Sequence, residues 1–518
     1  MRIGVYNRHW TTAGGGERYA GSIAQVLAAE HEVDVLTPEA VEWPDLEERL
    51  GLDLSGTRPV FFEDAGFGTL AATTEDYDLL VNCSYMSSEA SGARRGLYVV
   101  LFPTGWRDDL PAAKRLASRG LRAITAGDPY RFEWGRGFHF PESSPLRTYR
   151  WTSGESQLLI WGPADEDVPV RLTFGRRPGG VPETRVEVEG DGRVLATCTV
   201  NATRRTVGVA FSVRGAGPDS PVRLSIRSDP FVPREALGTG DVRELGVKLH
   251  AVRIGSGAGA LARERFPGLT APPPSLEFLD TYDRIVSISE FTKGWVKRLW
   301  DRESELLHPP VDPIPALPKE PLILGVGRFF GERAGHSKKQ LELVRAFRRL
   351  VREGARGWQL HLVGGCSQEQ ESYLERVRQA AKGLPVVLHV NAPGAELRDL
   401  YGRASLFWHA TGLDENEERH PHRLEHFGIS TVEAMSAGAV PVVIDRAGQR
   451  EIVEPNVSGL LFRSLDELVA ASRRLVADSD LRDRLRAGAI GRAAEFSSRR
   501  FGERLRSIVA SLAEAQPV

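Results

Sequence analysis

Two glutamates stand on either side of a glycine turn in the second half of the chain. Glu425 precedes the turn Phe427-Gly428-Ile429, and Glu433 follows it at the start of an apolar run. Backbone amides at a turn that enters a helix favour a phosphate, and carboxylates accept hydrogen bonds from hydroxyl groups. The pattern therefore indicates a site where a phosphate and the hydroxyls of a sugar or ribose are bound together.

Glu433 also has a structural interpretation. Ser430-Thr-Val-Glu433 is a capping-box pattern, in which the glutamate bonds back to the amide of Ser430. The substitution Glu433→Gln separates the two interpretations, because it keeps a capping-box residue and removes the charge. If that variant folds normally and binds nucleotide much more weakly, capping alone does not explain the glutamate.

Basic residues follow a strand-like run at 322–326. Arg328 ends the segment Gly325-Val-Gly-Arg328, and Lys338 and Lys339 lie in the loop or early helix after it. Eight of the 67 basic residues are lysines, so two adjacent ones are unusual in this chain. A compact ammonium is a good point charge for a diphosphate. Two solvated lysines at a helix start are the alternative.

A glycine turn lies near the N-terminus. Gly14, Gly15 and Gly16 stand between a strand-like run at 3–6 and a helical stretch that starts at Glu17. Glycines at such a turn let the backbone approach a ligand, and the amides of a helix start favour an anion. The spacing is not GxGxxG, which disfavours a nicotinamide dinucleotide. A tight turn without a ligand is the alternative.

We expect the elements of the second half to meet at one edge of a sheet. Short apolar runs alternate with helical stretches through about 495, which predicts a doubly wound parallel sheet, and such sheets bind ligands beyond the carboxyl ends of their strands. Gly448-Gln-Arg-Glu451 is a further loop at such a position, although an acidic residue also favours an ordinary helix N-terminus.

Histidines and acidic residues between 409 and 426 raise the question of a metal site. His420-Pro-His422 is interrupted by proline and does not match HExxH, so we interpret the segment as a charged loop and expect no metal ligands. The absence of a GxSxG motif disfavours a serine hydrolase. The residues concerned are His409, Asp414, Glu415, Glu417, Glu418, His420, His422 and His426.

The composition excludes several classes of protein. The chain has 518 residues, of which 41% are hydrophobic, so it is too apolar to be largely disordered. Its net charge is −2 and it has no polybasic tail, so we expect no nucleic-acid partner. Cys83, Cys198 and Cys366 form no CxxC pair, which favours a reducing compartment. Without a signal peptide or an apolar run of about 20 residues, we expect a cytoplasmic protein.

One basic segment has two interpretations. The stretch from Arg107 to Arg122 carries lysine and arginine among leucines. It is compatible with peripheral contact at the anionic inner face of a membrane. The more common explanation for such a stripe is a solvated helix face.

The patterning divides the chain into α/β and β regions. Residues 1–126 and 259–312 predict a first Rossmann-like α/β domain, and residues 313–495 predict a second. Between 127 and 258 polar and apolar residues alternate in segments separated by Gly, Pro and Asp turns, which predicts an inserted antiparallel β-sandwich. Residues 496–518 form a last helix that we expect to pack back toward the first domain.

These motifs resemble those of family-4 retaining glycosyltransferases, which have the GT-B fold of two Rossmann-like domains facing a cleft. The glutamates 425 and 433 match the Glu-x7-Glu signature of that family, Arg328 with Lys338 resembles its donor-phosphate pair, and the turn at 14–17 resembles its N-terminal glycine loop. The resemblance implies sugar transfer from a UDP- or GDP-sugar to a glycan or glycolipid acceptor, without a cofactor or an essential protein-bound metal.

The resemblance also implies roles for individual residues. Arg328 and Lys338 would stabilise the negative charge of the departing diphosphate. Glu425 would contact the donor sugar and Glu433 the ribose. The remaining donor-binding residues would be Gly15, Gly16, Lys339, as the alternative to Lys338, and the turn residues Phe427, Gly428 and Ile429.

Two features depart from the family pattern. Many relatives carry a histidine before a Phe-Pro pair in the first domain, where this chain has Leu101 before Phe102-Pro103. The inserted sandwich resembles a carbohydrate-binding module, and its Trp134, Trp151 and Trp161 would either stack on sugars or lie in its core. The leading hypothesis is an active glycosyltransferase whose cleft closes about the proline-rich linker 309–318. The alternative is an inactive carbohydrate-binding scaffold.

Overall fold

The computed structural model divides into two compact units. Unit 1 comprises Met1–Phe61, Thr74–Asp109 and Leu276–Val518, and unit 2 comprises Phe62–Thr73 and Leu110–Ser275. The structure describes residues 1–12, 14–38, 41, 43–62, 68–103, 112–125, 127–139, 142–143, 148–237, 243–270, 276–331, 337–367 and 370–514.

Unit 1 begins with a parallel sheet in the strand order β17-β16-β5-β4-β1-β2-β3. Its strands are largely buried apolar runs, as a sheet covered by helices requires, and the strand expected at 3–6 is confirmed. Ser289 caps α8 (Glu290–Trp300) by accepting a hydrogen bond from the Thr292 amide, as its position predicts. The strands are β1 (Arg2–Tyr6), β2 (Glu32–Thr37), β3 (Thr57–Phe61), β4 (Leu79–Asn82), β5 (Gly96–Val100), β16 (Arg284–Ser287) and β17 (Glu305–Leu306), with the helices α1 (Gly15–Ala28) and α2 (Trp43–Leu50).

The chain leaves this sheet after β5 and returns to it at β16, the strand beside β5. The two strands pair in parallel, with Tyr98 opposite Ile285. A long excursion between adjacent strands leaves the sheet itself uninterrupted. The polypeptide between them contributes most of unit 2.

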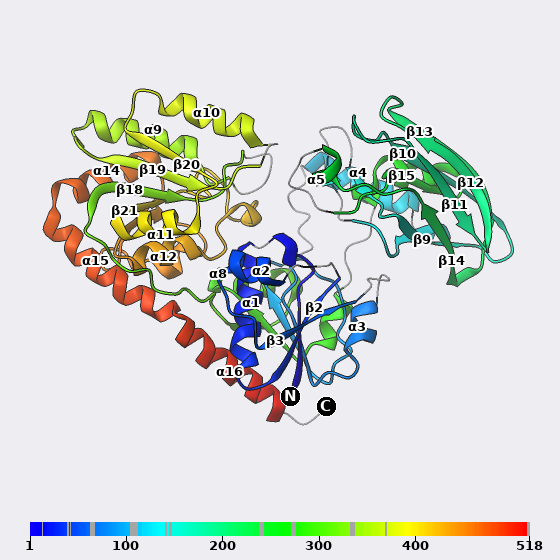
Figure 1. Ribbon diagram of the computed structural model, residues 1–518, viewed down its shortest axis with the longest axis horizontal. Helices are drawn as coiled ribbons and strands as arrows, with labels where there is room; N and C mark the ends of the chain where they lie inside the picture. The colour runs from blue at the N-terminus through cyan, green and yellow to red at the C-terminus, as the bar shows by residue number, and fades with distance from the viewer. Residues whose placement is uncertain are drawn as a thin grey trace. The chain divides into compact units, whose positions relative to one another are not determined.

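A second parallel sheet has the order β20-β19-β18-β21-β22-β23 (Figure 1). β18 lies between β19 and β21, so the strand order reverses at β18, and the loops after β18 and β21 lie beside each other. The strands are β18 (Glu320–Val326), β19 (Gln359–Gly364), β20 (Val386–Val390), β21 (Ala404–His409), β22 (Val440–Ile444) and β23 (Leu460–Phe462). The helices are α9 (Gln340–Arg352), α10 (Glu371–Ala381), α11 (Gly394–Arg403), α12 (Ile429–Ser436), α13 (Gln449–Ile452), α14 (Leu465–Ala477) and α15 (Ser479–Ala493).

Two crossings of the chain join these domains. The proline-rich segment 309–318 is non-helical, as expected, and the Val311 amide donates to the carbonyl of Phe496 in the second crossing. The last helix, α16 (Ser498–Glu514), then lies along α1 (Figure 1). The ring centres of Phe501 and Tyr19 lie 5.7 Å apart, and this contact anchors α16 to the first domain.

Unit 2 contains two antiparallel sheets with the orders β13-β10-β15-β8-β7 and β12-β11-β14-β9-β6. Leu158 and Ile160 of one sheet and Leu172 and Phe174 of the other belong to one apolar core. The strands are β6 (Arg131–Trp134), β7 (Glu142–Ser143), β8 (Thr148–Trp151), β9 (Glu155–Gly162), β10 (Asp167–Gly175), β11 (Thr184–Gly190), β12 (Arg193–Val200), β13 (Thr206–Arg214), β14 (Gly217–Arg227) and β15 (Lys248–Ile254). Its helices include α4 (Ala112–Thr125) and α6 (Gly257–Arg265).

The three tryptophans singled out in unit 2 differ in exposure. Trp151 and Trp161 are 5% and 8% exposed, so they belong to the interior and do not offer a face to a sugar. Trp134 is half-buried, with its ring against Phe138 and the Arg150 guanidinium. The core interpretation therefore holds for two of the three.

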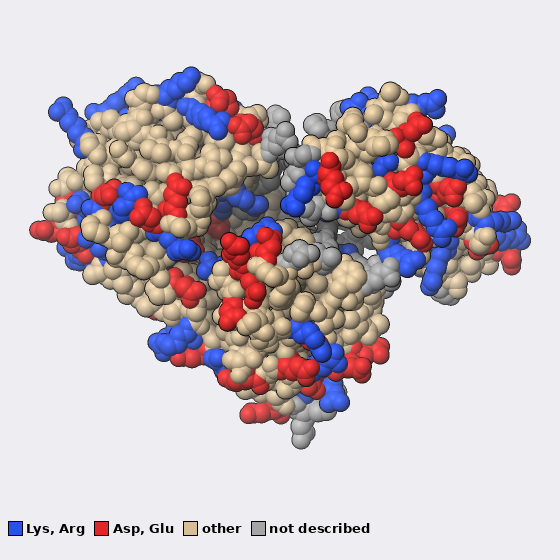
Figure 2. Space-filling view, in the orientation of Figure 1, with Lys and Arg blue, Asp and Glu red and all other residues tan. Residues whose placement is uncertain are grey.

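The described surface carries charges of both signs. Acidic and basic side chains are interspersed on the face seen in Figure 2. In the part of the chain that the structure describes, no helix has both the length and the apolar character to cross a bilayer. Of the basic segment at 107–122, residues 107–111 lie outside the described residues.

Candidate functional site

The switch point of the second sheet brings two predicted elements together. Leu324 of β18 pairs with Phe407 of β21, so Gly327-Arg328 after β18 and His409 at the end of β21 lie at the same edge. Ligands of open α/β sheets bind at this position. The geometry therefore supports a site at the carboxyl ends of β18 and β21.

Lys338 packs against the Gly327–Arg328 loop. A Cβ atom added at Gly327 would lie 2.6 Å from Cγ of Lys338, so glycine is needed for this approach. Gln340, at the start of α9, donates from its side-chain amide to the carbonyls of Gly327 and Arg328, both at 3.0 Å, and accepts from Tyr373 at 3.1 Å. The buried amide thus fixes the loop that carries Arg328.

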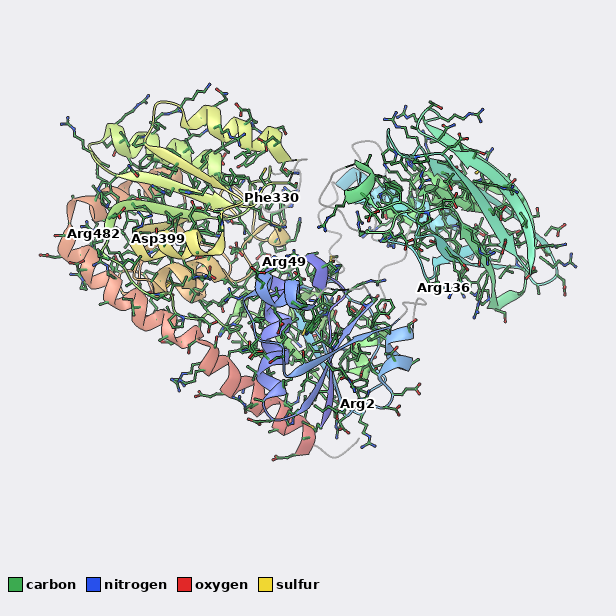
Figure 3. All side chains as sticks on the ribbon, in the orientation of Figure 1. Arg2, Arg49, Arg136, Phe330, Asp399 and Arg482 are labelled. Atoms are coloured by element: carbon green, nitrogen blue, oxygen red, sulfur yellow. The ribbon has the colours of Figure 1, made fainter. Side chains whose placement is uncertain are left out.

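Arg328 is exposed at this edge. Its guanidinium carbon lies 5.4 Å from the ring centre of Phe330, which Figure 3 labels. A guanidinium that stacks on an aromatic face keeps its N–H donors available in the plane of the group. Such a group is suited to binding an anion that enters from solvent.

Lys338 reaches Glu425 across the site. Its Nζ lies 2.5 Å from Oε2 of Glu425, and both side chains are mostly buried, at 17% and 20% exposure. Charge-assisted hydrogen bonds of this length are strong where water is scarce. The structure therefore brings Lys338 and Glu425 together beside the loop that carries Arg328, although the two residues are 87 positions apart in the sequence.

Lys339 is not part of this group. It is the N-cap residue of α9 and has the left-handed conformation, with φ 57°, which turns its side chain away from that of its neighbour. Its Nζ lies 3.5 Å from Glu415, which is also 3.6 Å from Arg423. Of the two adjacent lysines, Lys338 is the one placed beside Gly327.

The turn at 427–429 is shaped by close backbone contacts. Gly428 has φ 122°, and a Cβ there would lie 2.2 Å from Nε2 of Gln449. A Cβ at Gly448 would lie 2.5 Å from Cα of Phe427, so the loop before α13 supports the turn directly. Ile429 is the first residue of α12, and the turn therefore points helix amides to the same edge.

Glu433 is held by residues that the sequence pattern did not indicate. It accepts a hydrogen bond from the Tyr401 hydroxyl at 2.9 Å and from the Arg18 guanidinium at 3.3 Å. Burial raises the pKa of Glu433, and Arg18 and Tyr401 act against this shift. The capping-box interpretation is wrong, because α12 begins at Ile429 with Gly428 as its N-cap, so Ser430 already lies inside the helix.

The N-terminal glycines face this turn. A Cβ at Gly15 would lie 3.8 Å from Cδ1 of Ile429, and one at Gly16 would lie 3.0 Å from Cδ1 of Leu101. Glu17 accepts hydrogen bonds from the Gly14 amide at 2.8 Å and from Thr12 at 2.6 Å, so its carboxylate fixes the start of α1. Leu101, at the position where many family members have a histidine, therefore packs against the glycine loop.

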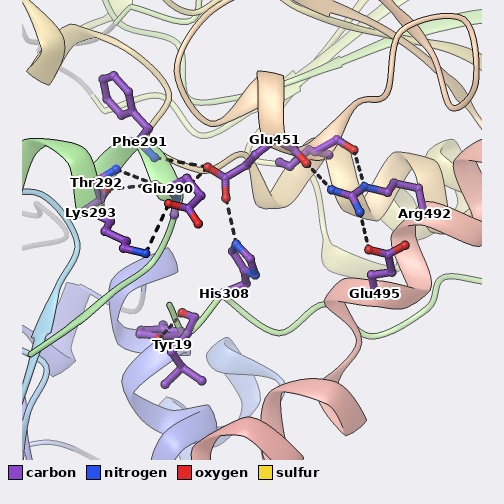
Figure 4. A network of polar contacts seen from close by, with 12 residues as sticks. Tyr19, Glu290, Phe291, Thr292, Lys293, His308, Glu451, Arg492 and Glu495 are labelled. Atoms are coloured by element: carbon purple, nitrogen blue, oxygen red, sulfur yellow. Dashed lines mark hydrogen bonds and ion pairs between the residues drawn. The ribbon is translucent and has the colours of Figure 1, made fainter. Parts of the chain in front are cut away.

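Glu451 links the two domains of unit 1 (Figure 4). Its Oε2 accepts from the amides of Glu290 and Phe291, at 2.9 and 3.4 Å, at the N-terminus of α8. Its Oε1 lies 2.9 Å from Nε2 of His308, whose ring stacks on Phe427. A carboxylate at a helix N-terminus is electrostatically favourable. The residue expected to begin a helix in one domain therefore stabilises a helix in the other.

The histidines of the 409–426 segment are dispersed. His409 contacts Glu425, His426 stacks on Phe102 at 4.1 Å, and His420 lies beside His422. Within the described residues, no group of three His, Cys, Asp or Glu side chains is arranged to hold a metal ion. The expectation of a metal-free site remains a prediction.

Several supporting residues were not found from the sequence. Gly364 ends β19 and Gly365 follows it, and a Cβ at Gly364 would lie 2.1 Å from the carbonyl oxygen of Gly327. The adjacent glycines at a strand end are the signal that would have indicated this contact. Arg18, Tyr401 and Gln340 had no such local signal.

Part of the chain matches a known family. Residues 313–492 match the family described as "Glycosyl transferases group 1". That range covers the second parallel sheet with the residues assembled above. The match is therefore confined to the second α/β domain.

Curated relatives match over shorter stretches. A Xenopus laevis protein named GDP-Man:Man(3)GlcNAc(2)-PP-Dol alpha-1,2-mannosyltransferase is 29% identical over 214 residues, which cover 36% of this chain and 40% of the relative. The Homo sapiens protein of the same name is 26% identical over 244 residues, covering 42% and 46%. The matched stretch thus spans less than half the length of these relatives.

Solved structures share the architecture. Anabaena HepE in complex with UDP and glucose aligns over 99% of this chain and 100% of HepE, with a TM-score of 0.51 and 12% identity. Sucrose-phosphate synthase from Thermosynechococcus elongatus aligns over 100% of both chains, with a TM-score of 0.51 and 15% identity. The chain therefore has an α/β fold with parallel sheets that matches GT-B glycosyltransferase structures.

Proposed function

We propose that this protein is a retaining glycosyltransferase that moves a sugar from a nucleotide diphosphate sugar to a glycan or lipid-linked acceptor. One observation carries the proposal: Lys338 meets Glu425 beside the Gly327–Arg328 loop at the switch point of a glycosyltransferase group 1 domain. A cation for the diphosphate and a carboxylate for the sugar lie side by side there. The UDP and glucose named for HepE and the GDP-mannose named for the relatives support a UDP- or GDP-sugar as donor.

In the proposed reaction the bond between the anomeric carbon and the diphosphate oxygen breaks. The acceptor oxygen bonds to the same face of that carbon, and its proton passes to the departing diphosphate. Arg328 and Lys338 stabilise the charge that grows on the diphosphate, which lowers the barrier more than it strengthens substrate binding. Amides of the turn 427–429 assist them, while Glu425 binds the sugar and Glu433 the ribose.

In the proposal the first domain binds the acceptor, and its glycine turn and Arg18 also contact the donor-binding residues. Gly15 and Gly16 lie against Ile429 and Leu101, and Arg18 reaches Glu433.

We propose that positive charge from Arg328 and Lys338 takes the place of an essential protein-bound metal ion. Transfer that persists in excess EDTA would support this, and loss restored by added Mg²⁺ or Mn²⁺ would contradict it.

A panel of UDP- and GDP-sugars tests the function. We expect turnover of at least one donor, measured as release of nucleoside diphosphate, and an α-linked product from an α-linked donor by nuclear magnetic resonance. If no donor is bound or hydrolysed, the enzyme proposal fails. A product of inverted configuration contradicts the retaining mechanism alone.

The second candidate is an inactive scaffold that binds carbohydrate through unit 2. The presence of Leu101 where relatives have histidine is the observation in its favour. We assign residues 127–258 to the inserted β-sandwich, on the basis of two antiparallel sheets around one core. The remaining domains are then 1–126 with 259–312, 313–495, and 496–518, while unit 2 extends beyond the sandwich because α4 and α6 belong to it. Burial of Trp151 and Trp161 removes two stacking surfaces and weighs against the scaffold.

We also propose that unit 2 contacts an anionic membrane at the cytoplasmic face through α4. The solvent face of this helix carries Leu116 and Ile124, 71% and 53% exposed, with exposed Arg119 between them. Apolar and basic residues on one exposed face are typical of an interfacial helix. Flotation with phosphatidylglycerol vesicles tests the proposal.

The matched variants for the flotation experiment lie within unit 2. We expect Leu116→Ser with Ile124→Ser to reduce recovery with the vesicles. Val194→Ser, which changes a 51% exposed residue on β12, serves as the control and leaves recovery unchanged. Equal recovery of all three proteins, or equal binding to neutral phosphatidylcholine vesicles, would contradict the proposal.

A further inference from the structure

A buried histidine contacts the carboxylate at the centre of the proposed site. His409 ends β21, and its side chain is 3% exposed. Its Nε2 lies 3.0 Å from Oε2 of Glu425, the same oxygen that Lys338 contacts at 2.5 Å. Thr411 Oγ1 lies 3.4 Å from the same nitrogen, a longer and weaker contact. One oxygen of Glu425 therefore meets an ammonium and an imidazole.

The hydrogen-bond pattern assigns the proton of His409. An ionised carboxylate only accepts hydrogen bonds, so Nε2 is the nitrogen that donates. Burial lowers the pKa of His409, and Lys338 adds to this shift while Glu425 opposes it. The neutral ring then carries no proton on Nδ1, which has no hydrogen-bond partner among the described residues. An unprotonated nitrogen avoids burying an N–H group without an acceptor.

The contacts of Glu425 with Lys338 and with His409 respond differently to a bound donor. A diphosphate attracts the Lys338 ammonium more strongly than a single carboxylate does, because it carries more negative charge. The neutral imidazole of His409 feels no comparable attraction and remains on Glu425. The carboxylate thus keeps a buried partner after Lys338 has turned to the phosphates.

We infer that His409 is a positioning residue, which holds Glu425 against the transferred sugar while Lys338 binds the diphosphate. The inference rests on the proposed function, because it needs a donor with both a sugar and a diphosphate. In this view the buried His409 allows Glu425 to bind the sugar while Lys338 stabilises the charge on the diphosphate. His409 acts through Glu425 and does not itself touch the substrate.

Two substitutions separate this role from a structural one. His409→Gln keeps an N–H donor near the position of Nε2, whereas His409→Met fills the space without a donor. We expect the methionine variant to lose about 10-fold in affinity for the sugar nucleotide and in kcat, the loss of a hydrogen bond to a charged group. Its affinity for the free nucleoside diphosphate, measured by titration calorimetry, should change less than about twofold.

The glutamine variant should recover most of the lost affinity. Equal losses for the sugar nucleotide and the free nucleoside diphosphate, or no loss for either, would overturn the role of His409. If the methionine variant does not fold, His409→Asn replaces it, since its shorter amide cannot reach Glu425. A wild-type protein that binds nucleoside diphosphates and their sugars equally well overturns the inference alone, and one that binds neither overturns the proposed function with it.

Discussion

Lys338 and Lys339 are neighbours in the sequence but have different surroundings. Lys338 lies against Gly327 and Glu425 at the edge of the sheet, while Lys339 is buried beside Glu415. The left-handed backbone at Lys339 directs the two side chains apart. We therefore assign the diphosphate to Lys338.

Substitution of each lysine by methionine tests this assignment. Lys338→Met should lower kcat about 100-fold, the cost of one donor to transition-state charge, in a protein that remains folded at the assay temperature. Lys339→Met removes a buried cation from Glu415 and should lower Tm by about 2 °C or more. Lys382→Met, at an exposed lysine of the same domain, is the control that should change neither. Loss of activity at Lys339 without loss of stability would reverse the assignment.

The carboxylate of Glu433 should give nucleotide binding a characteristic pH dependence. Burial raises the pKa of Glu433, so protonation begins at a higher pH than for an ordinary glutamate. Since the ionised form accepts more hydrogen bonds from ribose, affinity should fall as the pH is lowered through that pKa. Glu433→Gln should bind more weakly at pH 7 and lose this part of the pH dependence. Identical pH profiles for the two proteins, measured by calorimetry, would contradict the role of Glu433.

The sequence predicts some residues of the site better than others. Arg328, Lys338 and Glu425 were expected to meet, because each follows a strand of one parallel sheet and the strand ends share an edge. Arg18 and Tyr401 were not expected, because contacts to Glu433 from 415 and 32 positions away leave no local pattern. The capping-box error at Ser430 arose from a helix that begins two residues earlier than its polar pattern suggests.

At the scale of elements, glycines at strand ends and at one helix start allow the loops of the site to approach each other. A Cβ atom added at one of these glycines would lie very close to a neighbouring atom. The distance is 2.6 Å at Gly327, 2.1 Å at Gly364 and 2.5 Å at Gly448. The buried apolar strands were readily predicted, since period and composition define them. Which loop packs against which glycine depends on tertiary packing, and the sequence alone does not provide it.

Gly327→Ala tests whether this close packing positions Lys338. The added methyl group meets Cβ and Cγ of Lys338 at 3.1 and 2.6 Å, so the lysine must move. We expect kcat to fall toward that of Lys338→Met, and the double variant to be no slower than Lys338→Met alone. Gly491→Ala, in α15 with open space around the added methyl group, is the control and should leave kcat unchanged. Additive losses in the double variant would contradict the coupling.

At the scale of the whole molecule, the two α/β domains of unit 1 are joined close to the proposed site. The linker 309–318 and the crossing at 494–497 lie beside each other, and α16 packs on α1. His308 and Glu451 connect this region to α8 and to the turn at Phe427. A ligand bound at the turn would therefore contact residues that are connected directly to the segments joining the two domains.

We expect the cleft between these domains to close about 309–318 when nucleotide binds. Small-angle scattering should show a smaller radius of gyration under saturating nucleoside diphosphate. Glu451→Gln, which weakens the contact with the N-terminus of α8, should broaden the distance distribution of the free protein. An unchanged scattering profile at saturation would count against closure.

The most direct measurement is a crystal structure of the protein with a bound nucleoside diphosphate. The account predicts the pyrophosphate between Arg328 and Lys338, near the turn 427–429, with the ribose hydroxyls on Glu433. Lys338 should have left Glu425, which His409 still holds. A nucleotide bound elsewhere, or a pyrophosphate that touches neither Arg328 nor Lys338, would contradict it.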